Sequence, residues 1–88
     1  MRPSEGRIVV TRRRAQRDLD ALDKSARSAI IAALAALARG EPNVDVRRLQ
    51  GIDPPQSRLR VGRYRVIFGI EPGVITVERV LDRRDAYR

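Results

Sequence analysis

The chain has 88 residues, which suits one domain, spanning residues 1–88, with a single hydrophobic core. It contains no cysteine and no histidine, so disulfides and thiolate chemistry are excluded and the commonest metal ligand is missing. Nineteen basic residues against eleven acidic ones give a net charge of +8, and a surplus of this size favours a polyanionic partner.

The first predicted element is a short strand, and a helix follows it directly. The run "RIVV", residues 7–10, is rich in β-branched residues, which is typical of a strand. Thr11 is the expected N-cap of a helix that continues to about Leu22. The apolar face of this helix consists of Ala15, Leu19 and Leu22.

The clearest helical signal is the stretch "SARSAIIAALAALARG", residues 25–40. Gly40 is the expected C′ residue that ends this helix. The connection around Asp23 and Lys24 is short, so the two helices are predicted to pack as an antiparallel hairpin. The apolar stripe of the second helix consists of Ile30, Ile31, Leu34, Leu37 and Ala38.

The second half of the chain predicts a loop and then three antiparallel strands. Residues 41–56 hold three of the five prolines and show no periodicity, which is typical of a loop. Tight turns at Gly62 and at Pro72–Gly73 join the strands that follow, and turns this short force an antiparallel meander. The helices must cover one face of that sheet, so the predicted fold class is α+β. The predicted strands are residues 58–61, 64–70 and 74–81.

Arginines are concentrated in the first two strands of the predicted meander. Strand alternation places Arg58 and Arg60 on one face of their strand, and Arg63 and Arg65 on one side of the next. If the hairpin closes at Gly62, the two pairs converge on one basic surface. The residues alone therefore favour a protein that binds nucleic acid or an acidic protein, and a solvated sheet face is the alternative.

Three stretches, "RRLQG", "SRLRVGRYRVIFGIE" and "RVLDRRDAYR", resemble the RelE/ParE superfamily of bacterial toxins, and the resemblance covers essentially the whole chain. It implies a RelE-like fold with an N-terminal strand, a helical hairpin, a three-stranded meander and a short C-terminal segment. It also implies the toxin of a type II toxin–antitoxin system, held in a hetero-oligomer by an antitoxin that offers an acidic amphipathic segment. RelE-type members cleave mRNA in the ribosomal A site, whereas ParE-type members inhibit DNA gyrase.

The resemblance also implies roles for individual residues. Basic side chains on the second and third strands hold the scissile phosphate, a further basic residue follows the last strand, and a C-terminal tyrosine stacks on a nucleobase and assists proton transfer. The implied catalytic residues are Arg58, Arg65, Arg83 and Tyr87. The implied RNA-binding residues are Arg60, Arg63, Arg84, Arg47 and Arg48. No metal ion and no cofactor is implied.

The terminal tyrosine favours one of the functions that the superfamily offers. ParE-type members usually lack a tyrosine in the position of Tyr87, so the resemblance favours metal-independent RNA cleavage on the ribosome. Gyrase inhibition and a binding role without catalysis are the alternatives. The chain departs from the RelE pattern at three positions, where other members often have histidine or lysine, a small residue, and lysine: Asp82, Leu81 and Gln56.

The sequence also carries an expectation about location. No apolar run approaches the length of a membrane span, and no signal-peptide pattern opens the chain. We therefore expect a cytoplasmic protein with no membrane partner. The expected partners are the antitoxin, mRNA and the ribosome.

Overall fold

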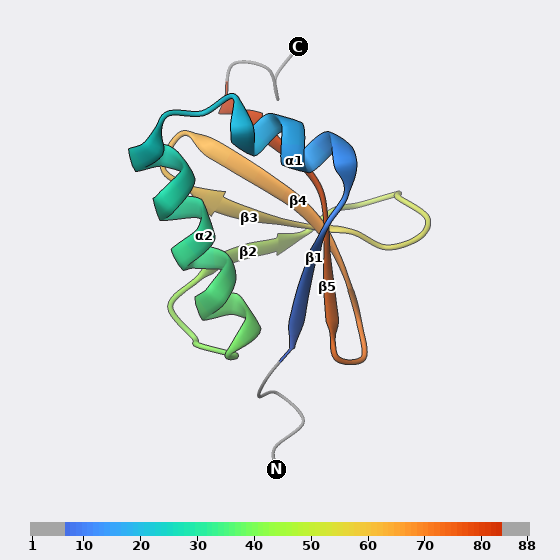
Figure 1. Cartoon of the computed structure of the whole chain (residues 1–88). Helices are drawn as coiled ribbons and strands as arrows, with labels where there is room; N and C mark the ends of the chain where they lie inside the picture. The colour runs from blue at the N-terminus through green and yellow to red at the C-terminus, as the bar shows by residue number, and fades with distance from the viewer. Residues whose placement is uncertain (1–6, 84–88) are drawn as a thin grey trace.

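Five strands and two helices make up the computed structural model, which describes residues 7–83 (Figure 1). Within these residues no helix is long and apolar enough to cross a membrane. The first strand, the two helices and the closing meander confirm the predicted α+β fold. In chain order the elements are β1 (Ile8–Thr11), α1 (Arg13–Asp20), α2 (Lys24–Ala38), β2 (Asp45–Arg48), β3 (Ser57–Val61), β4 (Tyr64–Glu71) and β5 (Val74–Asp82).

The five strands form one sheet in the order β1-β5-β4-β3-β2. β3, β4 and β5 pair antiparallel, as the short turns predict. Gly62 and Gly73 occupy those turns with φ angles of 58° and 76°, which glycine adopts without steric cost. β1 pairs in parallel with β5 over residues 74–77, so the rest of β5 has no strand on that side.

One strand lies where the sequence predicts only a loop. β2 falls inside residues 41–56 and pairs antiparallel with β3, with Val46 opposite Leu59. All four residues of β2 are exposed and only Val46 is apolar, so the segment has no alternating hydrophobic pattern. Pairing with the edge of β3 stabilises this strand, and that pairing is a long-range feature that a local pattern does not contain.

The first helix begins later than predicted. Its N-cap is Arg12, which makes no side-chain hydrogen bond to the helix end, so the prediction of Thr11 as the cap is wrong. Thr11 is the last residue of β1 and pairs with Val77. Strand pairing therefore prevails over the capping preference of threonine. The helix ends at Asp20, before the predicted Leu22.

The prediction that Gly40 ends the second helix is confirmed. Its N–H donates to the carbonyl of Leu37 at 3.0 Å, and the N–H of Glu41 donates to the carbonyl of Ala36 at 3.1 Å. This pair of bonds is the Schellman motif, and Gly40 has the positive φ angle of 75° that the motif requires. At the other end of α2 the Asp23 carboxylate accepts a backbone hydrogen bond as the N-cap.

The two helices rest on the sheet more than on each other. α1 contacts mainly β5, whereas α2 contacts β1 and β3. Figure 1 shows α1 along one end of the sheet and α2 descending from it at an angle. This arrangement differs from the close antiparallel packing that the short connection suggests.

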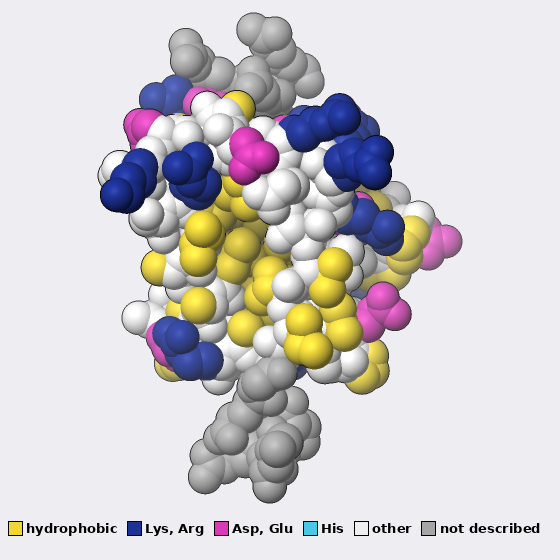
Figure 2. Space-filling model, in the orientation of Figure 1, with side chains coloured by type: hydrophobic (Ala, Val, Ile, Leu, Met, Phe, Trp, Pro, Cys, Tyr) yellow, Lys and Arg dark blue, Asp and Glu magenta, His cyan; other side chains and the backbone are white. Residues whose placement is uncertain are grey.

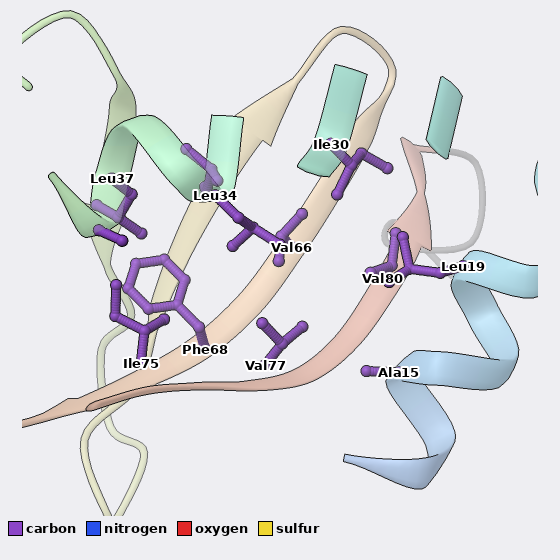
Figure 3. Packing of buried hydrophobic residues seen from close by; sticks show 12 residues of the cluster. Ala15, Leu19, Ile30, Leu34, Leu37, Val66, Phe68, Ile75, Val77 and Val80 are labelled. Carbon is purple, nitrogen blue, oxygen red and sulfur yellow. The ribbon is translucent and has the colours of Figure 1, made fainter. Parts of the chain in front are cut away.

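The hydrophobic core lies between the helices and one face of the sheet (Figure 3). Ile30 and Leu34 of α2 point toward Val66, while Leu19 of α1 lies against Val80. Every sheet residue of this cluster belongs to that same face, so the opposite face contributes nothing to it. The buried members within residues 7–83 are Ala15, Leu19, Ile30, Leu34, Leu37, Ala38, Leu59, Val66, Phe68, Ile75, Val77 and Val80.

A carboxylate joins α1 to the part of β5 that has no strand beside it. Asp18 Oδ2 accepts hydrogen bonds from the backbone N–H of Val80 at 2.9 Å and from Arg79 Nε at 2.8 Å. Arg79 Nη2 donates to the second oxygen at 3.3 Å. Burial raises the pKa of Asp18, but the hydrogen bonds from Arg79 and Val80 outweigh it, so the net pKa is lowered.

We expect Asp18→Asn to destabilise the protein by about 1.5 kcal/mol, or roughly 8 °C in melting temperature, because a charge-assisted hydrogen bond to Arg79 is lost. Because the folded pKa of Asp18 lies below its unfolded value, this stabilisation is present above pH 4 and disappears as the pH falls through the folded pKa. Thermal melts of both proteins from pH 7 to pH 2.5 measure the difference. Asp20→Asn, on the exposed side of the same helix, is the control, and a difference that persists unchanged in acid would contradict the assignment.

Candidate functional site

The face of the sheet that the helices leave open carries four of the eight arginines that were predicted as site residues. Residues opposite each other on neighbouring strands point to the same face. One row across the sheet runs from Arg47 to Arg58, Ile67 and Arg79. A second row runs from Asp45 to Arg60, Arg65 and Leu81. This open face, defined by these eight residues, therefore holds five arginines and one acid.

Arg65 occupies the most constrained position on the open face. It lies in the middle of the sheet, directly opposite Arg60 on one side and Leu81 on the other. The residue is 8% exposed and is the one charged residue in the described part of the chain that is classed as buried. Burial and strand pairing together limit the directions that the guanidinium can take, so its charge is presented at a defined place.

Arg58 lies in the other row of the open face, opposite Ile67, and its hydrogen bonding is incomplete. Its side chain is 16% exposed, and its Nη2 atom lies 3.7 Å from Asp45 Oδ1, which is an ion pair without a hydrogen bond. Arg58 Nε is buried and finds no hydrogen-bond partner among residues 7–83. A buried donor of this kind is costly, and an anion that reaches it supplies the missing acceptor.

Arg63 lies in the β3–β4 turn and is engaged locally. Its Nη2 atom donates to Asp82 Oδ2 at 2.6 Å, and this hydrogen bond raises the pKa of Arg63. The Arg63 guanidinium also lies 5.8 Å from the centroid of the Tyr64 ring. The backbone N–H of Arg83 donates to the Arg63 carbonyl at 2.7 Å, so Arg83 directly follows β5 at the same end of the sheet.

An apolar groove lies on the helix side of the protein, between α2 and β1. Figure 2 shows hydrophobic side chains gathered in a hollow there, with basic side chains above it over α1. Ile31 is 54% exposed beside this groove although it is a large apolar residue. The groove is lined by Val9, Thr11, Gln16, Leu19, Arg27, Ile31, Leu34 and Ala35.

The sequence match is decisive for the family. Residues 9–87 match the family described as ParE toxin of type II toxin-antitoxin system, parDE. The chain belongs to the ParE toxin family. It is therefore the toxin of a type II toxin–antitoxin system, and the expected RelE/ParE superfamily is confirmed. No curated protein matches the toxin.

Three solved antitoxin–toxin complexes contain chains with a similar fold, each with a TM-score of 0.74 over 89% of the toxin. The RelB-RelE complex from Methanococcus jannaschii matches at 21% identity over 94% of its chain. The RelE-RelB complex from Pyrococcus horikoshii matches at 23% identity over 96%. The RelBE2 complex from Mycobacterium tuberculosis matches at 24% identity over 99%. At these identities the likeness shows the fold.

The toxin structure groups some of the predicted site residues and separates others. Arg47, Arg58, Arg60 and Arg65 share the open face, as alternation predicts for the β3 and β4 members. Arg48 pairs with Ser57 in the row of Phe68 and so lies on the helix side. Arg63 and Arg83 lie at the turn end of the sheet. The remaining two, Arg84 and Tyr87, lie outside the described residues.

Sequence reasoning missed Arg79, which the toxin places on the open face opposite Ile67. Strict alternation along β5 puts Arg79 on the same side as Val77, toward the core. A register shift between Ile67 and Phe68 makes Glu78 an extra residue in the pairing, so Arg79 turns to the other face. No local signal in the sequence marks this bulge.

Proposed function

We propose that the toxin is a RelE-like endoribonuclease that cleaves mRNA in the ribosomal A site and so inhibits translation in the cytoplasm. The observation that carries this proposal is the placement of Arg58, Arg60 and Arg65 on adjacent strands of the open face. Guanidinium groups donate to phosphate oxygens in a bidentate fork, which suits them to a phosphate that gains charge during reaction.

The proposed reaction is attack of a ribose 2′-oxygen on the adjacent phosphorus, with departure of the 5′-oxygen of the next nucleotide. The 2′-OH loses a proton to a base, and the leaving 5′-oxygen gains one from an acid. Arg58 and Arg65 stabilise the charge that develops on the phosphate oxygens, and Arg83 approaches the same phosphate from the end of β5. These arginines do not move protons, because guanidinium stays charged in proteins.

Proton transfer is assigned to the C-terminal segment and to the ribosome. Tyr87 is proposed to stack on a nucleobase and to assist proton transfer, and Arg84 is proposed to bind RNA beside it. No group of three or more His, Cys, Asp or Glu side chains able to hold a metal ion occurs within residues 7–83. Position 82, where related toxins often have histidine or lysine, is an aspartate in this chain. The Asp82 carboxylate accepts a hydrogen bond from Arg63.

The apolar groove is the proposed seat of the antitoxin. An amphipathic segment can bury its apolar side against Ile31 and Leu34, and acidic residues on its other side can reach the surrounding arginines. Such an interface combines apolar burial with charge complementarity. The three neighbouring toxin structures were solved as antitoxin complexes, which supports a partner of this kind.

The match to the ParE toxin family favours inhibition of DNA gyrase as a second candidate. One experiment separates the two functions: brief expression in a bacterium, with RNA 5′ ends mapped by primer extension and plasmid supercoiling measured in parallel. We expect new 5′ ends inside translated codons and normal supercoiling. Loss of supercoiling without codon cuts would establish the gyrase reading instead.

We also expect the purified toxin to cut free RNA weakly or not at all. The described residues offer little acid–base equipment, so the ribosome must orient the 2′-OH and supply part of the chemistry. The measurement compares cleavage of one mRNA, free and in a programmed ribosome, at equal toxin concentration. Equally fast cutting of the free RNA would refute ribosome dependence.

A further inference from the structure

The N-terminal end of α1 faces the open face across a hollow of about 380 Å³. Four arginines line this hollow, with one glutamate, one glutamine and one apolar residue between them. Their positions are Arg12, Arg13, Arg14, Arg79, Glu78, Gln56 and Ile67. Within residues 7–83 none of the predicted site residues lines it. The proposed cleavage assigns no role to the triplet "RRR" of residues 12–14.

The hollow continues one row of the open face. Ile67 lines the hollow and is also the residue between Arg58 and Arg79 in the row that begins at Arg47. From Arg47 to Arg79 that row crosses three inter-strand spacings, or roughly 14 Å, and its last two members, Ile67 and Arg79, line the hollow. The cationic surface is therefore longer than one phosphate group.

The charges in the hollow are only partly neutralised. Arg12 Nε lies 3.4 Å from Glu78 Oε2, and Arg79 is paired with Asp18. Within residues 7–83 no carboxylate forms an ion pair with Arg13 or Arg14. The charge of Arg14 helps to lower the pKa of Asp18, but among the described residues neither guanidinium is held by a carboxylate in an ion pair.

Arg13 and Arg14 lie in the first turn of α1, where positive charge destabilises a helix. The N-terminal end of a helix carries partial positive charge and favours acidic residues in its first turn. α1 has no acid there and no side-chain cap at Arg12. Adjacent arginines in the first turn break the preference for acidic residues there. Because they do not stabilise the helix, a functional role explains them better than a structural one.

We propose that this hollow binds the phosphodiester backbone of a single-stranded nucleic acid, as a second site beyond the phosphate that is cleaved. The inference deepens the proposed function and rests on its RNA substrate. The hollow has one apolar lining residue, Ile67, whereas protein interfaces have an apolar centre. The apolar surface lies instead in the groove between α2 and β1. An acidic protein segment therefore fits the groove, and a nucleic acid fits the hollow.

The site reads backbone charge and not base sequence. The two aromatic residues of the described chain, Tyr64 and Phe68, lie in rows that face the helices and the core. Bases therefore have no aromatic side chain to stack on in this part of the surface. The arginines can bind the backbone phosphates, which RNA and DNA have in common.

The test compares Arg13→Gln/Arg14→Gln with Lys24→Gln/Arg39→Gln, a control that removes the same charge from exposed positions on α2 and its C-cap. Binding of the full-length toxin to a labelled 12-nucleotide RNA, the same DNA sequence and poly-glutamate is followed by fluorescence anisotropy at several salt concentrations. We expect the first variant to bind RNA and DNA about tenfold more weakly, with a salt slope smaller by about 1.4. We expect the control to bind much as the wild type does.

Two outcomes overturn the proposal. Equal losses in both variants would show that the effect is one of general charge, and a loss confined to poly-glutamate would assign the hollow to an acidic protein. Thermal melting gives a second readout, because removal of cations from the α1 N-terminus should leave the melting temperature unchanged or higher. A lower melting temperature would make the two arginines structural and overturn the site. Full toxicity of folded Arg65→Ala and Arg83→Ala would refute the cleavage proposal while leaving this binding result standing.

Discussion

Arg65→Ala is expected to lower ribosome-dependent cleavage by about a hundredfold, or about 3 kcal/mol of transition-state stabilisation. Arg65 lies near the start of β4, the central strand of the sheet, and the residue is 8% exposed, so its guanidinium needs little reorganisation when charge develops on the phosphate. The measurement is the single-turnover rate of mRNA cleavage in programmed ribosomes, supported by growth inhibition on expression.

The companion variants separate charge from position. Arg65→Lys keeps the charge but loses the bidentate fork, so we expect an intermediate rate. Arg60→Ala removes an exposed arginine directly opposite and should cost less, because that side chain is freer to move. Circular dichroism and thermal melting check that each variant is folded. Full toxicity of folded Arg65→Ala and Arg83→Ala would leave gyrase inhibition or simple binding as the function.

The parts of the fold that the sequence predicted are those with a complete local pattern. α2 has an apolar stripe and a glycine stop at Gly40, and the meander has alternating strands with glycine in both turns. β2 was missed because its four exposed residues contain one apolar side chain, Val46. Arg79 was missed because one extra residue in β5 reverses the alternation. In both cases pairing between distant segments decides the outcome, and no local window contains that information.

The residues of the candidate site likewise divide into those that a local pattern predicts and those that depend on long-range packing. Arg58, Arg60 and Arg65 could be placed on one face because period-2 alternation survives on β3 and on the first residues of β4. The arginines of residues 12–14 could not, because their position over the sheet depends on how α1 packs beside β5. The role of Tyr87 stays a prediction of the family resemblance.

The two sides of the sheet now have different chemistry and, in our proposals, different partners. The helix side offers apolar surface around Ile31, whereas the eight residues of the open face include five arginines and one acid, Asp45, with Glu78 beside them in the hollow. A nucleic acid gains little from the first surface, and an apolar protein segment gains little from the second. Substitutions on the helix side should therefore weaken antitoxin binding without changing nucleic-acid binding, and substitutions on the open face should do the reverse.

Ile31→Asp is the sharpest test of that division. We expect this variant to remain toxic but to bind its antitoxin about a hundredfold more weakly, or about 3 kcal/mol, because a carboxylate replaces an apolar side chain at the groove and must be buried beside an acidic segment. Ile31 is 54% exposed in the toxin alone, so the change should leave folding intact. The measurements are growth on co-expression of toxin and antitoxin, and affinity by calorimetry with the purified antitoxin.

The matched control is Ala32→Asp, one position along the same helix, which is exposed and does not line the groove. It adds the same charge to α2 at nearly the same place, so any general effect of lowering the net charge appears in both variants. Neutralisation should fail for Ile31→Asp and succeed for Ala32→Asp. If the antitoxin protects cells equally from both, the groove between α2 and β1 is not where it binds.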